Sequence, residues 1–418
     1  VQHYLVKMMD RIISALDNNS KGEAVAVIVT MIDWRQAFPR QCPTLAIQSF
    51  IRNGVRPALI PILMSFFENR RMSVKWRDAM SVTKRLKGGG PQGSTKGVLS
   101  YMSQSNNNTD CVPEDDRYKY FDDATVLEVI NLLNIGLSSY RVKDTVPSHI
   151  PAHNQFIDSN NLKSQEYLNK ISEWTDQNLM ALHVKKTKSM VFNFSRNCQF
   201  TTDILLNNER IEMVEQAKLL GTILTRDLKW DENTNYLVKD ANKRMLMLRA
   251  AAKFTSDKQV LKQIYYSRIR CKLEQSAAVW SSSLTQKNME DLERVQKAAV
   301  RLINGKPYES YSETLKQLGI MRLSERRTAI CLKFAKSCLR LENFKKLFPM
   351  HASKHDMKTR HEERYLVSRS NGKRHESSAI PKMIKLLNKE YKEQKQSLKK
   401  LSKSLLSPTN FACNRIYC

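Results

Sequence analysis

The sequence predicts an α+β fold, in which a mixed or antiparallel sheet with helices on one face is followed by an all-helical region. Three observations support this prediction. Residues 24–33 are a nearly continuous run of apolar, often β-branched residues, which is typical of a strand buried on both faces. Residues 117–130 place two strand-like runs around a tight turn. Residues 234–345 carry apolar residues at helical spacing almost throughout, with short breaks near 255, 283 and 305.

The remaining elements follow from local patterns. Four segments before residue 183 predict helices by their spacing and end signals: 3–17, 43–54, 57–70 and 161–182. Residues 71–88 predict a hairpin ahead of a glycine-rich loop, and residues 136–162, rich in Ser, Pro, His and Asn, predict a loop. Two strand-like segments follow at 188–195 and 217–230, the second interrupted by Gly221.

These patterns predict three parts. Residues 1–230 form a mixed α/β domain, residues 231–345 a helical domain, and residues 346–418 a basic tail that is helical or partly disordered. The chain begins at Val1 rather than at a methionine, so we expect a fragment of a longer protein.

Charge indicates the class of partner. The chain of 418 residues has 69 Lys and Arg against 41 Asp and Glu, a formal net charge of +28. Nucleic acid is the first expected partner of such a chain, with acidic membranes second. The eight cysteines are scattered without a CxxC pair, which favours reduced thiols in an intracellular protein over a disulfide framework or a zinc ribbon. No apolar run reaches the roughly 18 residues of a membrane span.

Two adjacent acids, Asp122 and Asp123, occupy the turn of the hairpin at 117–130. Asp is common in solvated turns, which is the simplest interpretation of the pair. However, like charges held together in a short turn repel each other, and Asp33 ends another buried strand. Mg²⁺ prefers carboxylate oxygens, and two such ions stabilise the attacking and leaving oxygens of phosphoryl transfer. Asp33 and Asp122 on neighbouring strand ends therefore predict a divalent metal site.

Five motifs in order then resemble the palm of reverse transcriptases, in the form used by non-LTR retrotransposons. They are TMIDWRQAFP, GGGPQGSTKGVLS, YFDDATVLEVI, NLMALHVKKTKSMVF and AKLLGTILTRDLKW. Residues 291–303 are similar to the thumb and downstream region of the jockey-like lineage. The resemblance covers about residues 1–325, and it implies a palm with partial fingers over 1–230 and a thumb over 231–345. The family's fingers segment is longer than the stretch before the first strand here, which implies N-terminal truncation.

The resemblance implies an RNA-directed DNA polymerase, which extends a DNA primer on an RNA template with deoxynucleoside triphosphates. It implies two Mg²⁺ ions, with Mn²⁺ as an alternative, held by Asp33 and Asp122 with support from Asp123. It also makes Lys186 a catalytic residue near the triphosphate, although Lys185 and Lys188 lie close in sequence and the run also fits a solvated face. The expected location is intracellular, and the nucleus is the candidate compartment.

Substrate contacts are implied in two places. Phe38 lies where the family has an aromatic residue that excludes a ribose 2′-hydroxyl, and a core role is the alternative. Pro91, Gln92 and Gly93 lie in the loop that contacts template and nucleotide, whereas the residues alone also fit a flexible loop. The order of Gly93 and the residues after it does not match a P-loop.

Two positions depart from the family pattern. Pro39 removes a backbone donor after the first acidic strand, and the bulky Phe121 precedes the acid pair, where small residues are commoner. These departures motivate a second hypothesis, a co-opted or decayed relic that binds nucleic acid without polymerising. A splicing factor resembling group II intron maturases uses the same palm and is the third alternative.

Overall fold

The computed structural model describes residues 1–17, 24–91, 93–132, 155–195, 200–305, 310–350 and 364–405. These residues form two compact units. The first unit lies between residues 18 and 229, and the second combines helix α1 (Gln2–Asp17) with residues from 230 onward. The contact units divide at 229/230, with α1 in the second unit, and the predicted domains stay predictions. The predicted boundary at 345 stays a prediction.

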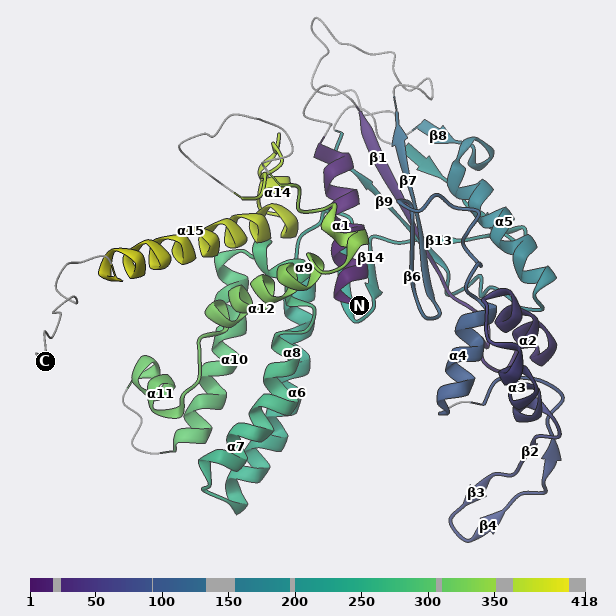
Figure 1. The fold of residues 1–418 in the computed structure, drawn as a ribbon, viewed down its shortest axis with the longest axis horizontal. Helices are drawn as coiled ribbons and strands as arrows, with labels where there is room; N and C mark the ends of the chain where they lie inside the picture. Colours follow the sequence, from purple (N-terminus) through teal and green to yellow (C-terminus); the bar gives the residue numbers. More distant parts are fainter. Residues whose placement is uncertain are drawn as a thin grey trace, which may run out of the picture. The chain divides into compact units, whose positions relative to one another are not determined.

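A five-stranded sheet forms the centre of the first unit (Figure 1), in the order β13-β9-β1-β7-β6. Its strands are β1 (Val25–Ile32), β6 (Arg117–Tyr120), β7 (Asp123–Asn131), β9 (Lys188–Asn193) and β13 (Glu212–Met213). Both neighbours of β1 run antiparallel to it, whereas β13 runs parallel to β9, so the sheet is mixed. Together with the helical second unit, this sheet confirms the predicted α+β fold class.

Strand β1 is central because its sequence suits a site without access to water. Every residue from Val25 to Ile32 except Met31 is buried. Its only polar side chain, Thr30, forms a 2.7 Å hydrogen bond with the Ser189 hydroxyl of β9. A buried polar group paired in this way avoids the cost of lost hydration. The prediction of a strand buried on both faces is therefore confirmed.

Helices α4 (Thr95–Gln104) and α5 (Lys163–Gln177) supply side chains to the core that one face of the sheet forms. Ile28 of β1, Tyr101 of α4 and Leu168 of α5 are all members of this buried cluster. A buried carboxylate fixes α5 to the sheet: Glu128 of β7 accepts the backbone N–H groups of Lys163 at 3.0 Å and Ser164 at 2.7 Å. An acid at this position caps the free donors of a helix N-terminus.

Smaller elements complete the first unit. Its other helices are α2 (Pro43–Arg52), the 3₁₀ turn Pro57–Leu59, α3 (Ile60–Phe67) and the 3₁₀ turn Ser159–Asn161. Its minor strands are β2 (Arg71–Met72), β3 (Lys75–Trp76), β4 (Ala79–Met80), β5 (Lys84–Arg85), β8 (Gln155–Ile157), β10 (Phe200–Thr202), β11 (Leu205–Leu206), β12 (Glu209–Arg210), β14 (Gln216–Leu219) and β15 (Thr222–Thr225). The predicted hairpin at 71–88 is confirmed, and the strand-like segment interrupted by Gly221 folds as the hairpin of β14 and β15. Most of the predicted loop at 136–162 lies outside the described residues.

The second unit is helical. Besides α1 it contains α6 (Asp231–Phe254), α7 (Lys258–Ile264), the π-helix Tyr265–Arg270, α8 (Cys271–Leu273), α9 (Ala277–Trp280), the 3₁₀ turn Ser281–Ser283, α10 (Gln286–Asn304), α11 (Tyr311–Leu318), α12 (Leu323–Cys338), α13 (Glu342–Lys345), α14 (Lys373–Glu376) and α15 (Ala379–Leu405). The three predicted breaks fall at the ends of these helices. Among the described helices, none has the length and apolar character needed to cross a bilayer.

Helix α1 is tied to the C-terminal helices of its unit by its last residue. Asp17 accepts hydrogen bonds from the backbone N–H groups of Asn371 and Gly372, both at 2.8 Å, and lies 3.0 Å from Nδ1 of the buried His375. Two turns before Asp17 on the same helix, burial raises the pKa of Asp10 to about 6. The charge of His375 lowers this pKa by a smaller amount. The N-terminal helix thus carries an acid whose charged form is costly in the folded state.

The raised pKa of Asp10 predicts a pH-dependent stability. The folded chain keeps the Asp10 proton up to about pH 6, whereas the unfolded chain releases it near pH 3.8. Stability is therefore lost as pH rises through this window. We expect Asp10→Asn to gain on the order of 2 kcal/mol relative to wild type at pH 7.5 but little at pH 4. Urea unfolding at both pH values measures this, and an equal effect at both would contradict the prediction.

Candidate active site

The pairing register of two neighbouring strands brings the predicted acids together. In the β1–β7 ladder, Ile32 lies opposite Ala124. Asp33 directly follows Ile32, and Asp123 directly precedes Ala124. The charge of Asp33 acts on the Asp123 carboxyl, which agrees with the two acids lying at the same end of this strand pair. Acids separated by 90 residues in the chain therefore meet at one edge of the sheet.

The third acid lies in the hairpin that joins β6 to β7. Tyr120 pairs with Asp123, so the loop consists only of Phe121 and Asp122. Phe121 has a φ of +55°, and its side chain is exposed and packs edge-on against Tyr120 at 5.0 Å between ring centroids. A positive φ is uncommon for a bulky residue and is found where the surrounding structure enforces it. The turn therefore holds the two adjacent carboxylates in a fixed position.

The three acids interact electrostatically. Burial raises the pKa of Asp123, and the charges of Asp122 and Asp33 raise it further. The pKa of the Tyr101 hydroxyl is also raised, first by burial and then by the charge of Asp122. A nearby positive charge would favour the ionised form of Asp123 beside these two negative charges.

Asp33 is held by its backbone. Its N–H donates to the Thr187 hydroxyl at 3.2 Å, and its carbonyl accepts the His183 N–H at 2.8 Å. Thr187 is completely buried, and the sequence does not reveal its role because a single Thr at a distance of 154 residues gives no signal. The segment before β9 therefore fixes Asp33 from the side opposite to β7 in the strand order.

One carboxylate oxygen of Asp33 lacks a hydrogen-bond partner among the described residues. This oxygen, Oδ2, is buried. The Lys186 ammonium lies 3.9 Å from this oxygen, while Lys188 pairs instead with Glu212 at 3.0 Å. Of these two lysines, the structure thus places Lys186 beside the acids. Its side chain is 65% exposed, so this surface ion pair contributes little to stability.

The residues fit a hard divalent cation. The donor set is carboxylate oxygen, Oδ2 of Asp33 has no hydrogen-bond partner among the described residues, and the charges of Asp122 and Asp33 raise the pKa of Asp123; a bound Mg²⁺ ion would suit the first and relieve the other two. Within the described parts of the chain, no three acidic, His or Cys side chains are already arranged as a complete metal-ligand group. Mg²⁺ commonly takes only one or two carboxylates and completes its shell with water and substrate phosphates. A site with only a few carboxylates and no complete ligand group is therefore compatible with Mg²⁺ binding.

The glycine-rich loop packs directly on the chain that follows Asp33. The Gly90 N–H donates to the Phe38 carbonyl and the Gly89 N–H to the Gln41 carbonyl, both at 2.8 Å. The Gln41 side chain is buried and accepts a hydrogen bond from Ser100 of α4 at 3.2 Å. A Cβ at Gly90 would lie 2.0 Å from Gln41 Oε1, so the Gln41 amide would have to move for any larger residue to fit. The loop is thus a packed structure rather than a free linker.

Phe38 is half-buried, so its burial fits both roles that the sequence left open, sugar exclusion and core packing. Its ring lies 4.9 Å from that of Tyr101, and it packs at the margin of the core. Ala37 before it is buried. The ring therefore supports the core on one side and retains exposed surface on the other.

The predicted substrate residues lead into helix α4. Gly93 is exposed with a φ of +79°, and Pro91 is half-buried, while Gln92 lies outside the described residues. Ser94 caps α4 by accepting the Gly97 N–H at 3.0 Å. The loop therefore leads directly into the N-terminus of α4, and helix N-termini are common sites for anions.

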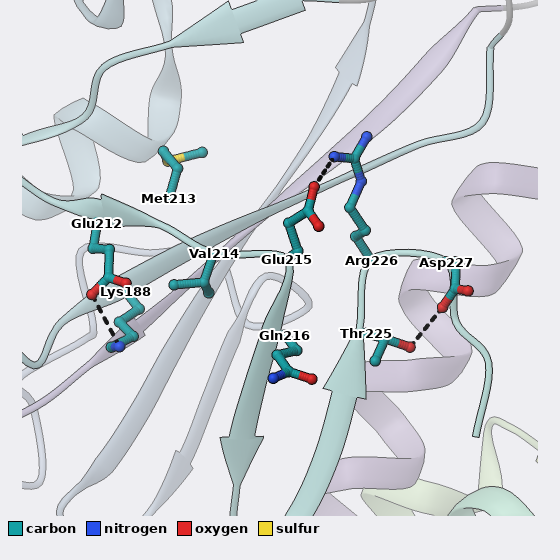
Figure 2. Close-up of a pocket in the computed structure, with 9 residues that line it drawn as sticks. All are labelled: Lys188, Glu212, Met213, Val214, Glu215, Gln216, Thr225, Arg226 and Asp227. Carbon is teal, nitrogen blue, oxygen red and sulfur yellow. Dashed lines mark hydrogen bonds and ion pairs between the residues drawn. The ribbon is translucent and has the colours of Figure 1, made fainter. Parts of the chain in front are cut away.

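A pocket of about 790 Å³ lies elsewhere in the first unit, where β9, β13, β14 and β15 meet (Figure 2). Ion pairs join Lys188 to Glu212 and Arg226 to Glu215, and Asp227 accepts a hydrogen bond from Thr225. The lining has two basic and three acidic side chains. Such a surface does not attract a polyanion, which distinguishes it from the basic chain as a whole.

The acidic strand ends and the packed glycine loop form the candidate active site. A comparison of the chain with known proteins finds one distant relative. Over 313 residues, 74% of its length, the chain is 24% identical to a probable RNA-directed DNA polymerase from transposon BS of Drosophila melanogaster. The chain spans 32% of that protein's length. It is therefore distantly related to a transposon reverse transcriptase.

Two further comparisons add little. No family model matches the sequence. The structure of apo telomerase from Candida tropicalis matches 81% of this chain and 55% of the telomerase chain, at 13% identity and a TM-score of 0.34. A TM-score this low does not establish a shared fold.

The packing of the glycine loop predicts an unequal response of two glycines. A Cβ on Gly97 would lie 2.0 Å from the Pro91 carbonyl oxygen, whereas on Gly88 the nearest atom is Gln41 O at 3.7 Å. We expect Gly97→Ala to destabilise the chain by about 2 kcal/mol, despite the better helix propensity of Ala. The matched Gly88→Ala should change stability by less than about 0.5 kcal/mol. Urea titration of both variants measures the difference, and equal stabilities would refute the described packing.

Proposed function

We propose that this chain is the RNA-directed DNA polymerase region of a non-LTR retrotransposon protein, and that it extends a primer 3′-hydroxyl along an RNA template. The observation that carries the proposal is the meeting of Asp33 with Asp122 and Asp123 at the ends of adjacent strands. The distant relationship to a transposon RNA-directed DNA polymerase supports it. The net charge of +28 suits an RNA template and a DNA primer as partners.

Asp33 and Asp122 would hold two Mg²⁺ ions, or Mn²⁺, with Asp123 supporting them. When bound, such ions neutralise charge on the attacking and leaving oxygens of phosphoryl transfer. The chain's own contribution is positional. The β1–β7 register and the two-residue turn fix the carboxylates before substrate arrives. Such preorganisation lowers the reorganisation needed during reaction.

The other predicted residues would bind and orient the deoxynucleoside triphosphate. Lys186, beside Asp33, would neutralise charge on the triphosphate or donate a proton to the departing pyrophosphate. Pro91, Gln92 and Gly93 would contact the template and the nucleotide. Phe38, held by Tyr101, would exclude a ribose 2′-hydroxyl. Action on chromosomal DNA would place the protein in the nucleus.

A second candidate function is nucleic-acid binding without polymerisation. Two observations favour it: the exposed Phe121 projects from the acidic turn, and the described acids do not form a complete ligand group. The basic helix α15 would then supply salt-sensitive binding to phosphates. Primer extension by the purified chain would exclude this candidate.

Removing the charge of Asp33 tests the polymerase proposal. We expect Asp33→Asn to reduce Mg²⁺-dependent primer extension on an RNA template at least a hundredfold, because the site loses a metal ligand while the side chain keeps its shape. Asp203→Asn is the matched control, since Asp203 pairs with Arg210 on the surface at 3.1 Å. Wild-type extension by Asp33→Asn would remove the proposed role.

Truncation of Phe38 tests sugar selection. We expect Phe38→Ala to raise incorporation of ribonucleotides relative to deoxynucleotides at least tenfold, because the ring no longer occupies the space of a 2′-hydroxyl. Single-nucleotide incorporation kinetics with both sugars measure the ratio. Thermal unfolding of the same variant reports the separate effect of losing the Tyr101 contact. An unchanged sugar ratio in a folded variant would leave Phe38 with a core role alone.

A further inference from the structure

An exposed β-arm in the first unit is not accounted for by the proposed active site. The arm, residues 70–87, consists of two short antiparallel ladders, β2 with β5 and β3 with β4. It extends beyond helices α2, α3 and α4 of its own unit (Figure 1). Its base is fixed: Arg70 donates to the Gly88 carbonyl at 2.9 Å, and the Leu86 N–H donates to the Arg70 carbonyl at 2.8 Å.

Large apolar side chains cover the arm but are not packed into a core. Trp76 is 74% exposed at the end of β3, beside a tight turn at Arg77, whose φ is +53°. Four further apolar residues of the arm are more than half exposed: Met72, Val74, Met80 and Val82. An exposed apolar surface of this extent, held on a defined β-structure, indicates an interaction site.

The charge of the arm identifies the class of partner. Residues 70–87 contain seven Lys and Arg and one acid, Asp78, a net charge of +6. No carboxylate in the described parts of the chain forms an ion pair with the six cations beyond Arg70: Arg71, Lys75, Arg77, Lys84, Arg85 and Lys87. Unpaired cations repel a second copy of the same arm and attract a polyanion.

The exposed Trp76 favours single-stranded over double-stranded nucleic acid as the partner of the arm. Single-stranded nucleic acid offers both charged phosphates and free base faces, and aromatic side chains stack on such faces. A duplex hides its base faces within the helix, so the indole would add little to duplex binding. We propose that the arm binds single-stranded nucleic acid, with Trp76 stacking on a base and the neighbouring cations contacting phosphates. The inference rests on the proposed function only in naming this strand as unpaired template.

Binding without catalysis tests the proposal. Fluorescence anisotropy of the full chain with a labelled 15-nucleotide oligo(U), without Mg²⁺ or nucleotides, measures the affinity for single strands, and a blunt duplex of the same length serves for comparison. We expect Trp76→Ala to weaken single-strand binding about tenfold and duplex binding less than twofold. Phe254→Ala is the matched control, because Phe254 is an aromatic residue of the second unit that is 90% exposed. It should change neither affinity.

The salt dependence separates stacking from charge. Lys84→Gln combined with Arg85→Gln should reduce the slope of log affinity against log salt by about 1.4, whereas Trp76→Ala should leave the slope unchanged. Wild-type single-strand affinity in a folded Trp76→Ala variant would overturn the proposal. Sedimentation data would also overturn the proposal if Trp76→Ala abolished self-association and left RNA binding intact, because the indole would then serve a contact between two copies of the chain. Because no Mg²⁺ is present, Asp33→Asn should bind like wild type, which keeps this test independent of polymerase activity.

Discussion

The pairing register of β1 with β7 is the constraint on which the candidate site depends. A shift by one residue would move Asp33 away from Asp123 and turn the buried apolar residues of both strands to the wrong face. Burial of these apolar residues therefore fixes the register, and the register in turn fixes the positions of the acids. Because Val27, Val29 and Leu127 are almost completely buried, the cost of such a shift greatly exceeds the repulsion between two partly exposed carboxylates.

Repulsion among the acids is consequently retained in the folded chain. Asp123 has a raised pKa, and Oδ2 of Asp33 is buried without a hydrogen bond from the described residues. Other contacts keep the acids in position: the Thr187 hydroxyl and the His183 N–H bond to the Asp33 main chain, and the β6–β7 turn contains Asp122. Local strain at Phe121 and electrostatic cost at the acids occur together, as expected of a site arranged for a ligand rather than for stability.

The sequence predicted the elements that have strong local signals. The apolar run of β1, the Asp-Asp hairpin and the helices between 231 and 345 appear as expected, because periodicity and turn residues act over short distances. The contact of Gln41 with the glycine loop was not predicted, nor was the support of Asp33 by Thr187, because these contacts join residues far apart and use side chains with no distinctive pattern. The membership of α1 in the second unit likewise depends on a partner more than 350 residues away, near His375.

The central claim is that the carboxylates of Asp33 and Asp122 share a divalent cation. The most direct measurement is a crystal structure of the chain with Mn²⁺, a primer–template and a non-reactive nucleotide, using the anomalous signal of manganese. The account predicts an anomalous peak within about 2.5 Å of carboxylate oxygens from both residues. A well-ordered complex in which manganese contacts neither residue would contradict it.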